Sequence, residues 1–355
     1  MRNMMRIIFA VKINKGKYII AAILIFILLF PVSVSILSKS DKKSSSLKEI
    51  GEFNLNESSI KFNDIGIKVD KVKVFISSEN KIVEMNLEDY LPGVVSGEMP
   101  AGFEIEALKA QAVAARTFAL AHVKSLGGAG CSKAPGADIC DTVHCQVYES
   151  KEQKFMEWNE SQRQELWDKV VSAVKATEGQ VLTYNGELVM SPQYFSASSG
   201  KTEDAAAVFG SSSPYLKSVD SPGEEIAGED YKKVYQYKYK DLADLINKAF
   251  PNAKVSDASL HKQIEILSAS EAGTVTKLKV GSITVTGSQF RFGLNLHSAN
   301  FTFNFKKDVV EIQCLGYGHQ VGMSQWGADV MAKNGSNYVQ ILTHYYQGTK
   351  VQKTQ

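Results

Sequence analysis

The sequence contains few of the residues and motifs that mark disordered, repetitive or nucleotide-binding chains. Proline occurs only 8 times in 355 residues and 44% of the residues are hydrophobic, which excludes a low-complexity or disordered chain. No internal repeat with a solenoid period is present. The sequence also lacks a phosphate-binding P-loop and the strand-elbow pattern around a nucleophilic serine. It is long enough for one large globular domain or two ordinary ones.

An excess of charge of either sign is also missing. The chain has 40 Lys and Arg against 38 Asp and Glu, and five of the basic residues lie in the first 17 positions, where there is no acid. The rest of the chain therefore holds 35 basic and 38 acidic residues and is slightly acidic. A body of this charge is unsuited to phosphate backbones, so nucleic acid is not an expected partner.

One long hydrophobic run is present, at residues 18–37, where no residue is charged. About 20 apolar residues are enough to cross a bilayer as a helix. The basic tail, residues 1–17, predicts by the positive-inside rule that this tail is cytoplasmic and that the chain beyond the helix is exported. Residues 38–59 are then a polar linker, and residues 60–355 form the exported domain. The alternative is a cleaved signal peptide, with Ser33-Val34-Ser35 as the small-residue cleavage site.

The first half of the exported part has the patterns of mixed helices and antiparallel strands. Apolar and polar residues alternate over residues 67–74, which predicts a strand with one wet face. The alanine-rich residues 105–124 predict a central buried helix. A second helix is predicted over residues 161–179, where Ser161 and Gln164 have the capping-box spacing. The pair Asn185-Gly186 predicts a tight β-hairpin.

The second half begins with a loop rich in proline and glycine at residues 211–230, which we expect to separate two lobes. A helix is predicted next, at residues 240–250, followed by short strands, among them residues 282–286 and 301–305. Two helices, at residues 322–333 and 338–346, are predicted to close the chain. The predicted fold class is therefore α+β. Helices and antiparallel strands form a two-lobed exported domain with a central groove, preceded by one transmembrane helix.

Glu98 is the strongest candidate for acid chemistry. It lies between Gly97 and Met99-Pro100, just before the predicted buried helix, in a poorly solvated setting that raises the pKa of a carboxyl group. A raised pKa is how a general acid is made at neutral pH. The alternative is a helix-terminal carboxylate that only accepts hydrogen bonds from the backbone.

Three further segments combine polar or reactive side chains with glycine or with a buried helix. Arg116 lies on the predicted buried helix, so it either neutralises a structural carboxylate or faces a cleft. Residues 194–202 carry aromatic rings, hydroxyls and one ammonium group, so they either belong to a functional site or form a solvated loop. His319 lies among three glycines ahead of a helix, where it contacts a ligand or satisfies a loop carbonyl.

Three of the four cysteines and a histidine cluster within a short loop. They are Cys131, Cys140, His144 and Cys145. Residues of these types bind zinc in closed tetrahedral sites, and a disulfide is the alternative in an exported protein. Because His144 and Cys145 are adjacent, both reach one ion only if the chain turns there. We interpret the cluster as a structural zinc site without a catalytic role.

Taken together, five stretches resemble the stage II sporulation protein D family, which is related to the amidase-enhancer domains of cell-wall hydrolases. The stretches occur in the expected order over the whole exported part, at residues 88–100, 111–119, 140–148, 194–202 and 318–328. The resemblance implies a membrane-anchored lytic transglycosylase. Such an enzyme cuts peptidoglycan between N-acetylmuramic acid and N-acetylglucosamine, on glycan strands stripped of their peptides, and forms a 1,6-anhydro end.

The resemblance also implies roles for individual residues and partners. Glu98 is the acid and base, supported by Arg116 and Lys201, and no cofactor takes part in catalysis. The implied partners are the amidase that strips the peptides and a membrane scaffold protein, both acting in forespore engulfment. The implied location is the cell membrane, with the catalytic domain outside the mother-cell cytoplasm, between the two septal membranes. The residues implied or expected to contact glycan are Gln111, Tyr148, Tyr194, Ser196, Ser198, His319 and Gln325.

Two other functions stay open from the sequence. A noncatalytic glycan-binding module that stimulates an amidase would need no acid at Glu98. A zinc hydrolase would use the cysteine and histidine cluster directly, although no pattern of three ligands with a free position is evident.

Overall fold

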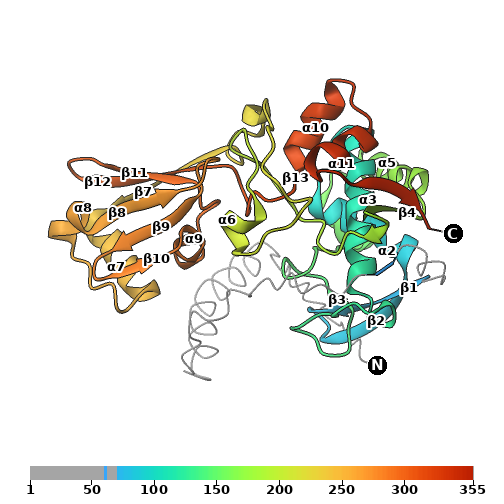
Figure 1. Ribbon diagram of the computed structural model, residues 1–355, viewed down its shortest axis with the longest axis horizontal. Coiled ribbons are helices and arrows are strands. Elements are labelled where there is room, and N and C mark those ends of the chain that lie inside the picture. The colour runs from blue at the N-terminus through green and yellow to red at the C-terminus, as the bar shows by residue number, and fades with distance from the viewer. Residues whose placement is uncertain (1–59, 62–69, 355) are drawn as a thin grey trace, which may run out of the picture. The chain divides into compact units, whose positions relative to one another are not determined.

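The computed structural model describes residues 60–61 and 70–354 (Figure 1). Its α-helices are α2 (Leu87–Glu98), α3 (Ile105–His122), α4 (Lys151–Glu157), α5 (Arg163–Ala176), α6 (Ala205–Phe209), α7 (Tyr239–Ala249), α8 (Leu260–Gln263), α9 (Gly287–Leu294), α10 (Gln325–Lys333) and α11 (Tyr338–Tyr345). Short 3-10 helices are η3 (Lys124–Leu126), η4 (Glu224–Ala227) and η5 (Asp257–Ser259). The strands are β1 (Lys71–Ile76), β2 (Lys81–Asn86), β3 (Ile139–Cys140), β4 (Gln180–Tyr184), β5 (Glu187–Leu188), β6 (Tyr194–Phe195), β7 (Lys232–Lys238), β8 (Ile264–Ala269), β9 (Val275–Val280), β10 (Ile283–Val285), β11 (Phe301–Phe305), β12 (Val309–Leu315), β13 (Met323–Ser324) and β14 (Lys350–Lys353).

Helix α3 is the centre of the larger hydrophobic core. It packs against α2, α5, α10, α11 and β4, and Figure 1 shows it among these elements. Its alanines at positions 107, 110, 112, 114 and 115 have no exposed surface, so neighbouring backbones can approach it closely. The prediction of a central buried helix over residues 105–124 is therefore confirmed.

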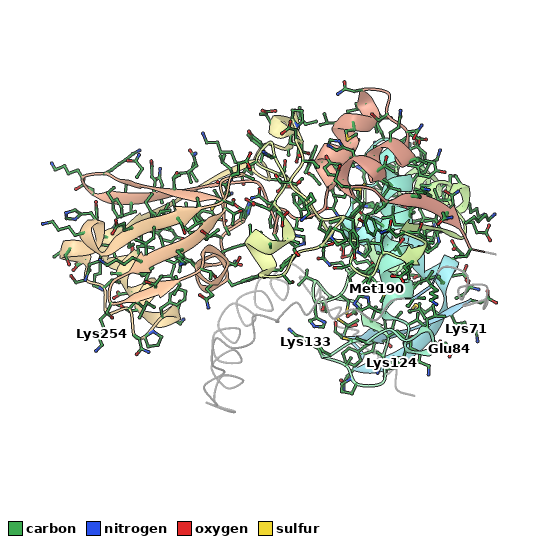
Figure 2. The ribbon with its side chains drawn as sticks, viewed as in Figure 1. Lys71, Glu84, Lys124, Lys133, Met190 and Lys254 are labelled. Carbon is green, nitrogen blue, oxygen red and sulfur yellow. The ribbon has the colours of Figure 1, made fainter. Side chains whose placement is uncertain are left out.

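Two local predictions for strands are also confirmed, although residues 67–69 of the strand predicted over 67–74 lie outside the described residues. Strand β1 alternates exposed Lys71 and Lys73 with buried Val72 and Val74, and it pairs antiparallel with β2. Across this pair Lys71 Nζ and Glu84 Oε1 lie 2.8 Å apart, on the exposed side of the sheet (Figure 2). Strands β4 and β5 form the hairpin, with left-handed φ angles of 52° at Asn185 and 81° at Gly186. These are the angles that a type I′ turn requires.

A second hydrophobic core lies between residues 242 and 314 and is formed by α7, α9 and two three-stranded sheets. One sheet has the order β11-β12-β7 and the other β10-β9-β8, and all their pairings are antiparallel. Within it the ring of Phe290 stacks on Phe250 and lies tilted against Phe301. The predicted α+β class is thus confirmed. The two-lobed arrangement and the groove stay predictions.

One capping prediction was wrong. Ser161 does not cap the second helix, because α5 begins after Gln162, and the Ser161 hydroxyl donates to Asn159 instead. A capping box does occur 11 residues earlier, where Ser150 and Gln153 begin the short helix α4. The sequence did not predict α4. Between α4 and α5, Asn159 Oδ1 accepts hydrogen bonds from the N–H and the hydroxyl of Ser161.

The predicted transmembrane helix, residues 18–37, lies outside the described residues. Within residues 60–61 and 70–354 there is no helix with the length and apolar character that a membrane crossing needs.

Candidate functional site

Glu98 is the last residue of helix α2 and is half-buried, so it keeps contact with solvent. The backbone N–H of Val147 donates a 2.5 Å hydrogen bond to Glu98 Oε1. The side chain of Gln325, at the start of α10, also faces this carboxyl group and lowers its pKa. Three segments that are distant in the sequence therefore meet at Glu98.

The surroundings of Glu98 raise its pKa from the ordinary carboxyl range to near neutrality. Burial raises the pKa of Glu98 to about 7, the hydrogen bond from Val147 and the side chain of Gln325 act in the opposite direction, and the nearby Glu149 raises it further. The partial negative charge at the C-terminal end of a helix also disfavours a carboxylate. A carboxyl group with a pKa near 7 has both protonation states available, as a group that gives and retrieves a proton requires.

Two glycines of α2 allow the loop that carries Val147 to lie directly on the helix. A β-carbon at Gly93 would collide with the ring of Tyr148 and lie 2.7 Å from Glu149 O. One at Gly97 would lie 3.0 Å from Val147 O. The spacing of four residues places both glycines on one face of the helix. This spacing is a sequence signal that another backbone packs closely on this face of α2, but it does not identify Val147.

Aromatic and amide side chains extend the site away from Glu98. The ring of Tyr148 stacks on Tyr90 at a centroid distance of 5.2 Å. Gln146 connects two tyrosines, because its Nε2 donates to Tyr90 Oη at 3.1 Å and its Oε1 accepts from Tyr194 Oη at 3.0 Å. Sequence reasoning missed Gln146 and Tyr90. Strand β6 places Tyr194, because it pairs in parallel with β13, which leads directly into α10.

Gln111 and Gln325 belong to the same cluster, but both are almost fully buried. Gln325 Nε2 donates to Gln111 Oε1 across 3.5 Å, and Gln111 is 0% exposed. Gln111 Nε2 has no hydrogen-bond partner within the described part of the chain. The resemblance implied that both residues contact glycan. Their burial leaves both little surface for contact with a glycan, and Gln325 faces both Glu98 and Gln111.

Arg116 does not lie against Glu98. Its guanidinium makes a bidentate ion pair with Glu88, with Nε–Oε1 and Nη2–Oε2 distances of 2.7 Å, and it also donates to the backbone carbonyls of Gln180 and Val174. Its side chain is 1% exposed. Of the two roles that the sequence left open, the contacts match the neutralisation of a structural carboxylate.

Replacing Arg116 by methionine is therefore expected to destabilise the fold by about 3 kcal/mol, because it leaves the Glu88 carboxylate without its ion-pair partner. Urea unfolding measures the change. The matched control is Lys71→Met, which breaks the exposed pair with Glu84 and should change the free energy of unfolding far less. Equal effects of the two variants would contradict the structural role of Arg116.

Lys201 also lies apart from Glu98. Its Nζ pairs with Glu271 Oε1 at 2.6 Å, and its backbone forms an isolated bridge with Asp220. Glu271 lies in the turn between β8 and β9 and is highly exposed. The structure therefore shows Lys201 in an ion pair with Glu271, and its supporting role at Glu98 stays a prediction.

Two of the three serines of the 194–202 segment, Ser196 and Ser198, bind acidic side chains. Ser196 Oγ donates to Asp230 Oδ2 at 3.3 Å, and Trp326 Nε1 donates to the same oxygen at 3.3 Å. Ser198 is fully buried, and its Oγ and N donate to Glu224 at 2.6 and 2.7 Å. The burial of Ser198 leaves it no surface for a glycan.

His319 lies in an aromatic pocket next to the site. Its ring contacts Phe195 and Phe209 at centroid distances of 5.7 and 5.4 Å, and its Nδ1 accepts the N–H of Val321 at 3.1 Å. Burial lowers the pKa of His319 to about 3, helped by the nearby Arg291, so the ring is neutral at physiological pH. A neutral ring of this kind serves packing and hydrogen bonding.

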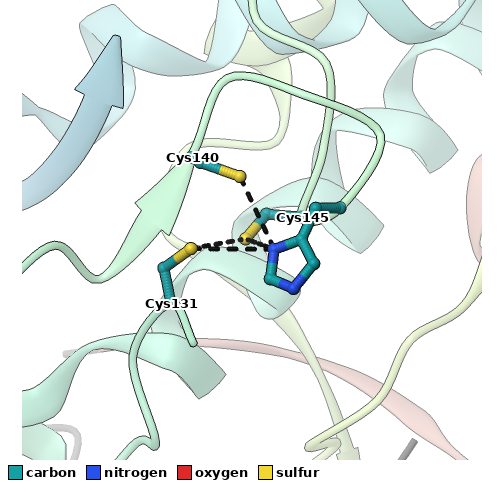
Figure 3. A group of neighbouring side chains, drawn as sticks. Cys131, Cys140 and Cys145 are labelled. Atoms are coloured by element: carbon teal, nitrogen blue, oxygen red, sulfur yellow. Dashed lines mark hydrogen bonds between the residues drawn. The ribbon is translucent and has the colours of Figure 1, made fainter. Parts of the chain in front are cut away.

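The predicted metal ligands converge on one point (Figure 3). His144 Nδ1 lies 3.6 Å from the sulfurs of Cys131 and Cys140 and 3.4 Å from that of Cys145, and the Cys131 and Cys145 sulfurs are 3.7 Å apart. Tetrahedral zinc with ordinary bond lengths separates two sulfurs by about 3.8 Å and a sulfur from a nitrogen by about 3.6 Å. The four side chains fit such an ion, and all four cysteines of the chain are free thiols.

The backbone of the loop explains how adjacent ligands reach one point. Cys145 N donates to Thr142 O at 3.0 Å, which is the chain turn that His144 and Cys145 require. Strand β3 fixes Cys140 by pairing in parallel with β1. Ser132 Oγ lies 3.2 Å from His144 Nε2 and so orients the ring from outside the cluster.

Comparison with known proteins identifies the class to which this fold and site belong. The family model described as "Stage II sporulation protein" matches residues 76–184. Stage II sporulation protein D of Bacillus subtilis (strain 168) is 35% identical over 280 residues, covering 79% of this chain and 78% of that protein. The protein of the same name from Bacillus amyloliquefaciens is 35% identical over 289 residues, with the same coverage of both chains.

The chain therefore belongs to the stage II sporulation protein D family, which confirms the resemblance found in the sequence. It is also similar to the amidase enhancer of Bacillus subtilis (strain 168), with 29% identity over 308 residues. That match covers 73% of this chain and 40% of the amidase enhancer.

Proposed function

We propose that this protein is a lytic transglycosylase that cleaves peptidoglycan strands from which the peptides have been removed. Glu98 is its acid and base, and the cleaved bond joins N-acetylmuramic acid to N-acetylglucosamine. The observation that carries the proposal is the setting of Glu98. Its pKa of about 7 and its remaining contact with solvent give it the properties of a carboxylic acid that transfers a proton at neutral pH.

The arrangement of carboxylates favours this reaction over ordinary hydrolysis. A glycosidase needs two carboxylates, of which the second is a base or a nucleophile. The carboxylate whose charge raises the pKa of Glu98 is that of Glu149. It is held in an ion pair, with Glu149 Oε2 lying 2.7 Å from Lys154 Nζ. A transglycosylase needs one carboxyl group only, because the 6-hydroxyl of the muramyl ring is the nucleophile.

The proposed reaction returns Glu98 to its starting state. The protonated Glu98 gives its proton to the glycosidic oxygen, and the bond between this oxygen and the anomeric carbon of the muramyl ring breaks. The muramyl 6-hydroxyl oxygen bonds to that carbon, and its proton passes to Glu98. The products are a free 4-hydroxyl on N-acetylglucosamine and a 1,6-anhydro-muramyl end. Tyr148, stacked on Tyr90, offers a fixed aromatic face for a sugar ring.

We also propose that Cys131, Cys140, His144 and Cys145 hold a structural zinc ion. The distances among their ligand atoms support this assignment, and a site closed by four protein ligands has no position for water. Cys145 is followed directly by Gln146, Val147 and Tyr148, which contact Tyr90, Glu98 and α2. Zinc would therefore order the loop that supplies the N–H donor to Glu98, without entering the reaction.

The proposal includes the cellular setting that the family implies. Residues 1–17 are a cytoplasmic tail, residues 18–37 a single membrane anchor, residues 38–59 a linker and residues 60–355 the two-lobed catalytic domain with a groove for glycan. The domain faces the space between the septal membranes during forespore engulfment. Its partners there are the amidase that removes the peptides and a membrane scaffold protein.

One alternative function is supported by a specific finding. The similarity to an amidase enhancer fits a noncatalytic module that binds glycan and activates an amidase. This alternative predicts no cleavage products from the protein alone.

The two functions are separated by incubating peptide-free glycan strands with purified residues 38–355 and analysing the products by mass spectrometry. New fragments with 1,6-anhydro-muramyl ends are the expected result. Reducing ends in their place would indicate hydrolysis, and unchanged strands would support the noncatalytic alternative.

The rate of cleavage is expected to depend on pH in a specific direction. Because Glu98 must be protonated for the first step and has a pKa of about 7, the rate should fall about tenfold for each pH unit above 8. The measurement is the initial rate from pH 5 to 9. A rate that rises from pH 7 to pH 9 would contradict Glu98 as the acid.

A further inference from the structure

A second buried carboxylate, Glu224, lies close to the start of helix α10. The residue is 0% exposed, and its carboxylate is held by serine hydroxyls and a backbone N–H. Oε1 accepts from the hydroxyls of Ser198 and Ser221 at 2.6 and 2.5 Å. Oε2 accepts from Ser198 N and from Ser324 Oγ, both at 2.7 Å. Four donors of this kind compensate the loss of hydration that burial causes.

The carboxylate and the first turn of α10 are in close contact. Ser324 is the N-cap of the helix, and its Oγ accepts the N–H of Gly327 at 3.2 Å. A β-carbon at position 327 would lie 2.8 Å from Glu224 Oε1, so only glycine allows the helix to approach this closely. The same hydroxyl thus binds Glu224 and begins the helix. A carboxylate at a helix N-terminus is also favoured by the partial positive charge there.

The residue after Ser324 is Gln325, the partner of Glu98. Ser324 Oγ donates to Glu224 Oε2 at 2.7 Å, whereas the Gln325 amide faces Glu98, whose pKa it lowers, and donates to Gln111 across 3.5 Å. Any shift of the first turn of α10 would move the Gln325 amide relative to the Glu98 carboxyl. Movements of about 1 Å at such a contact reduce rates severely.

We infer that Glu224 is a positioning residue, which fixes the start of α10 through Ser324 and so holds the Gln325 amide against Glu98. The kinetic consequence rests on the proposed function, whereas the effect on the Glu98 carboxyl does not. The titratable groups that face Glu98 are Glu149, Tyr90 and Tyr194, and none of them is changed by the variants below.

Four variants of the exported chain test the inference. Gln325→Ala removes the amide, Glu224→Gln removes the charge that anchors Ser324, and Ser324→Ala removes the hydroxyl between them. The matched control is Glu203→Gln, which changes another buried carboxylate. Glu203 is 1% exposed and accepts from Ser270 Oγ and Thr274 N, away from α10. Thermal melting identifies any variant that fails to fold, and Ser324→Ala then replaces Glu224→Gln.

The first measurement follows the Glu98 carboxyl band by infrared titration, with Glu98→Gln as the reference. Loss of the Gln325 amide removes a group that favours the ionised form of Glu98, so the pH midpoint of the Glu98 titration should rise in Gln325→Ala. It should also rise in Glu224→Gln and in Ser324→Ala. Glu203→Gln should leave it unchanged. A midpoint that Glu224→Gln moves no more than the control would overturn the inference.

The second measurement is the kinetics of cleavage on peptide-free glycan. Gln325→Ala and Glu224→Gln should lower kcat about tenfold to a hundredfold with KM within about twofold, because the acid is misplaced while the glycan surface is intact. A fall in kcat/KM through KM alone would also overturn the inference. If wild-type protein cleaves no glycan, the proposed function fails, and the infrared titration still decides the role of Glu224.

Discussion

Replacing Glu98 by glutamine is expected to remove the formation of 1,6-anhydro-muramyl ends almost completely. Glutamine keeps the shape of the side chain and accepts the Val147 N–H, but it has no proton to give. General acid and base steps contribute about 10²–10⁴-fold each, so the rate should fall by at least about a thousandfold. Mass spectrometry of digested peptide-free strands measures the loss. An undiminished rate would move the acid to another residue.

The same variant has a second expected effect that needs no substrate. Between the unfolded pKa of 4.5 and the folded pKa of about 7 the folded state binds more protons, so the contribution of Glu98 to stability falls as pH rises through this range. At pH 8 Glu98→Gln should be more stable than wild type by up to about 3 kcal/mol, with little difference at pH 4. Urea unfolding at the two pH values tests this. A variant that loses both activity and stability at pH 8 would indicate a structural role for Glu98.

Loss of one ligand is expected to abolish the retention of zinc. Structural zinc contributes about 10–16 kcal/mol of apparent binding free energy, and Cys140→Ser replaces a thiolate by a poor ligand. Elemental analysis of purified protein should find about one zinc per wild-type chain and almost none in the variant. Cleavage should also decrease, because the loop from Cys145 to Tyr148 no longer holds Val147 N against Glu98.

Cys314→Ser provides the matched control, because Cys314 is buried against Ser298 in the second core, outside the ligand cluster. The Cys314→Ser variant should retain about one zinc ion per chain. Chelation separates a structural from a catalytic ion. A structural ion predicts that activity declines together with protection of residues 131–148 from hydrogen exchange, whereas a zinc hydrolase would lose activity at once while the loop stays folded. A disulfide between Cys131 and Cys145 in the purified protein would contradict the site.

The sequence predicted the local features of this fold well, because each depends on neighbours in the chain. The hairpin at Asn185-Gly186 follows from the left-handed angles that these residues tolerate. The alanine-rich helix α3 follows from its composition. The capping box was misplaced because Ser150 and Ser161 both have a glutamine three residues later, and only contacts at the helix start distinguish them.

The chemical groups of the site could also be read from the sequence, but their partners could not. Glu98 was predicted from its local setting, and the four candidate metal ligands from residue type and spacing. The role of Arg116 depended on a carboxylate 28 residues away, and that of Ser198 on one 26 residues away. A buried arginine or serine must have a partner, but local pattern does not say which one.

By itself, then, the amino-acid order determined the α+β class and the family and singled out Glu98 as the candidate acid, since periodicity, turn chemistry and residue type are local properties. Tertiary structure alone decided which groups touch that acid. The Val147 N–H and the Gln325 amide reach Glu98 from 49 and 227 positions away, and the first of these contacts exists because glycines in α2 admit another backbone. Hydrogen bonds act over about 3 Å, and only the packing of helices brings such distant segments within that range.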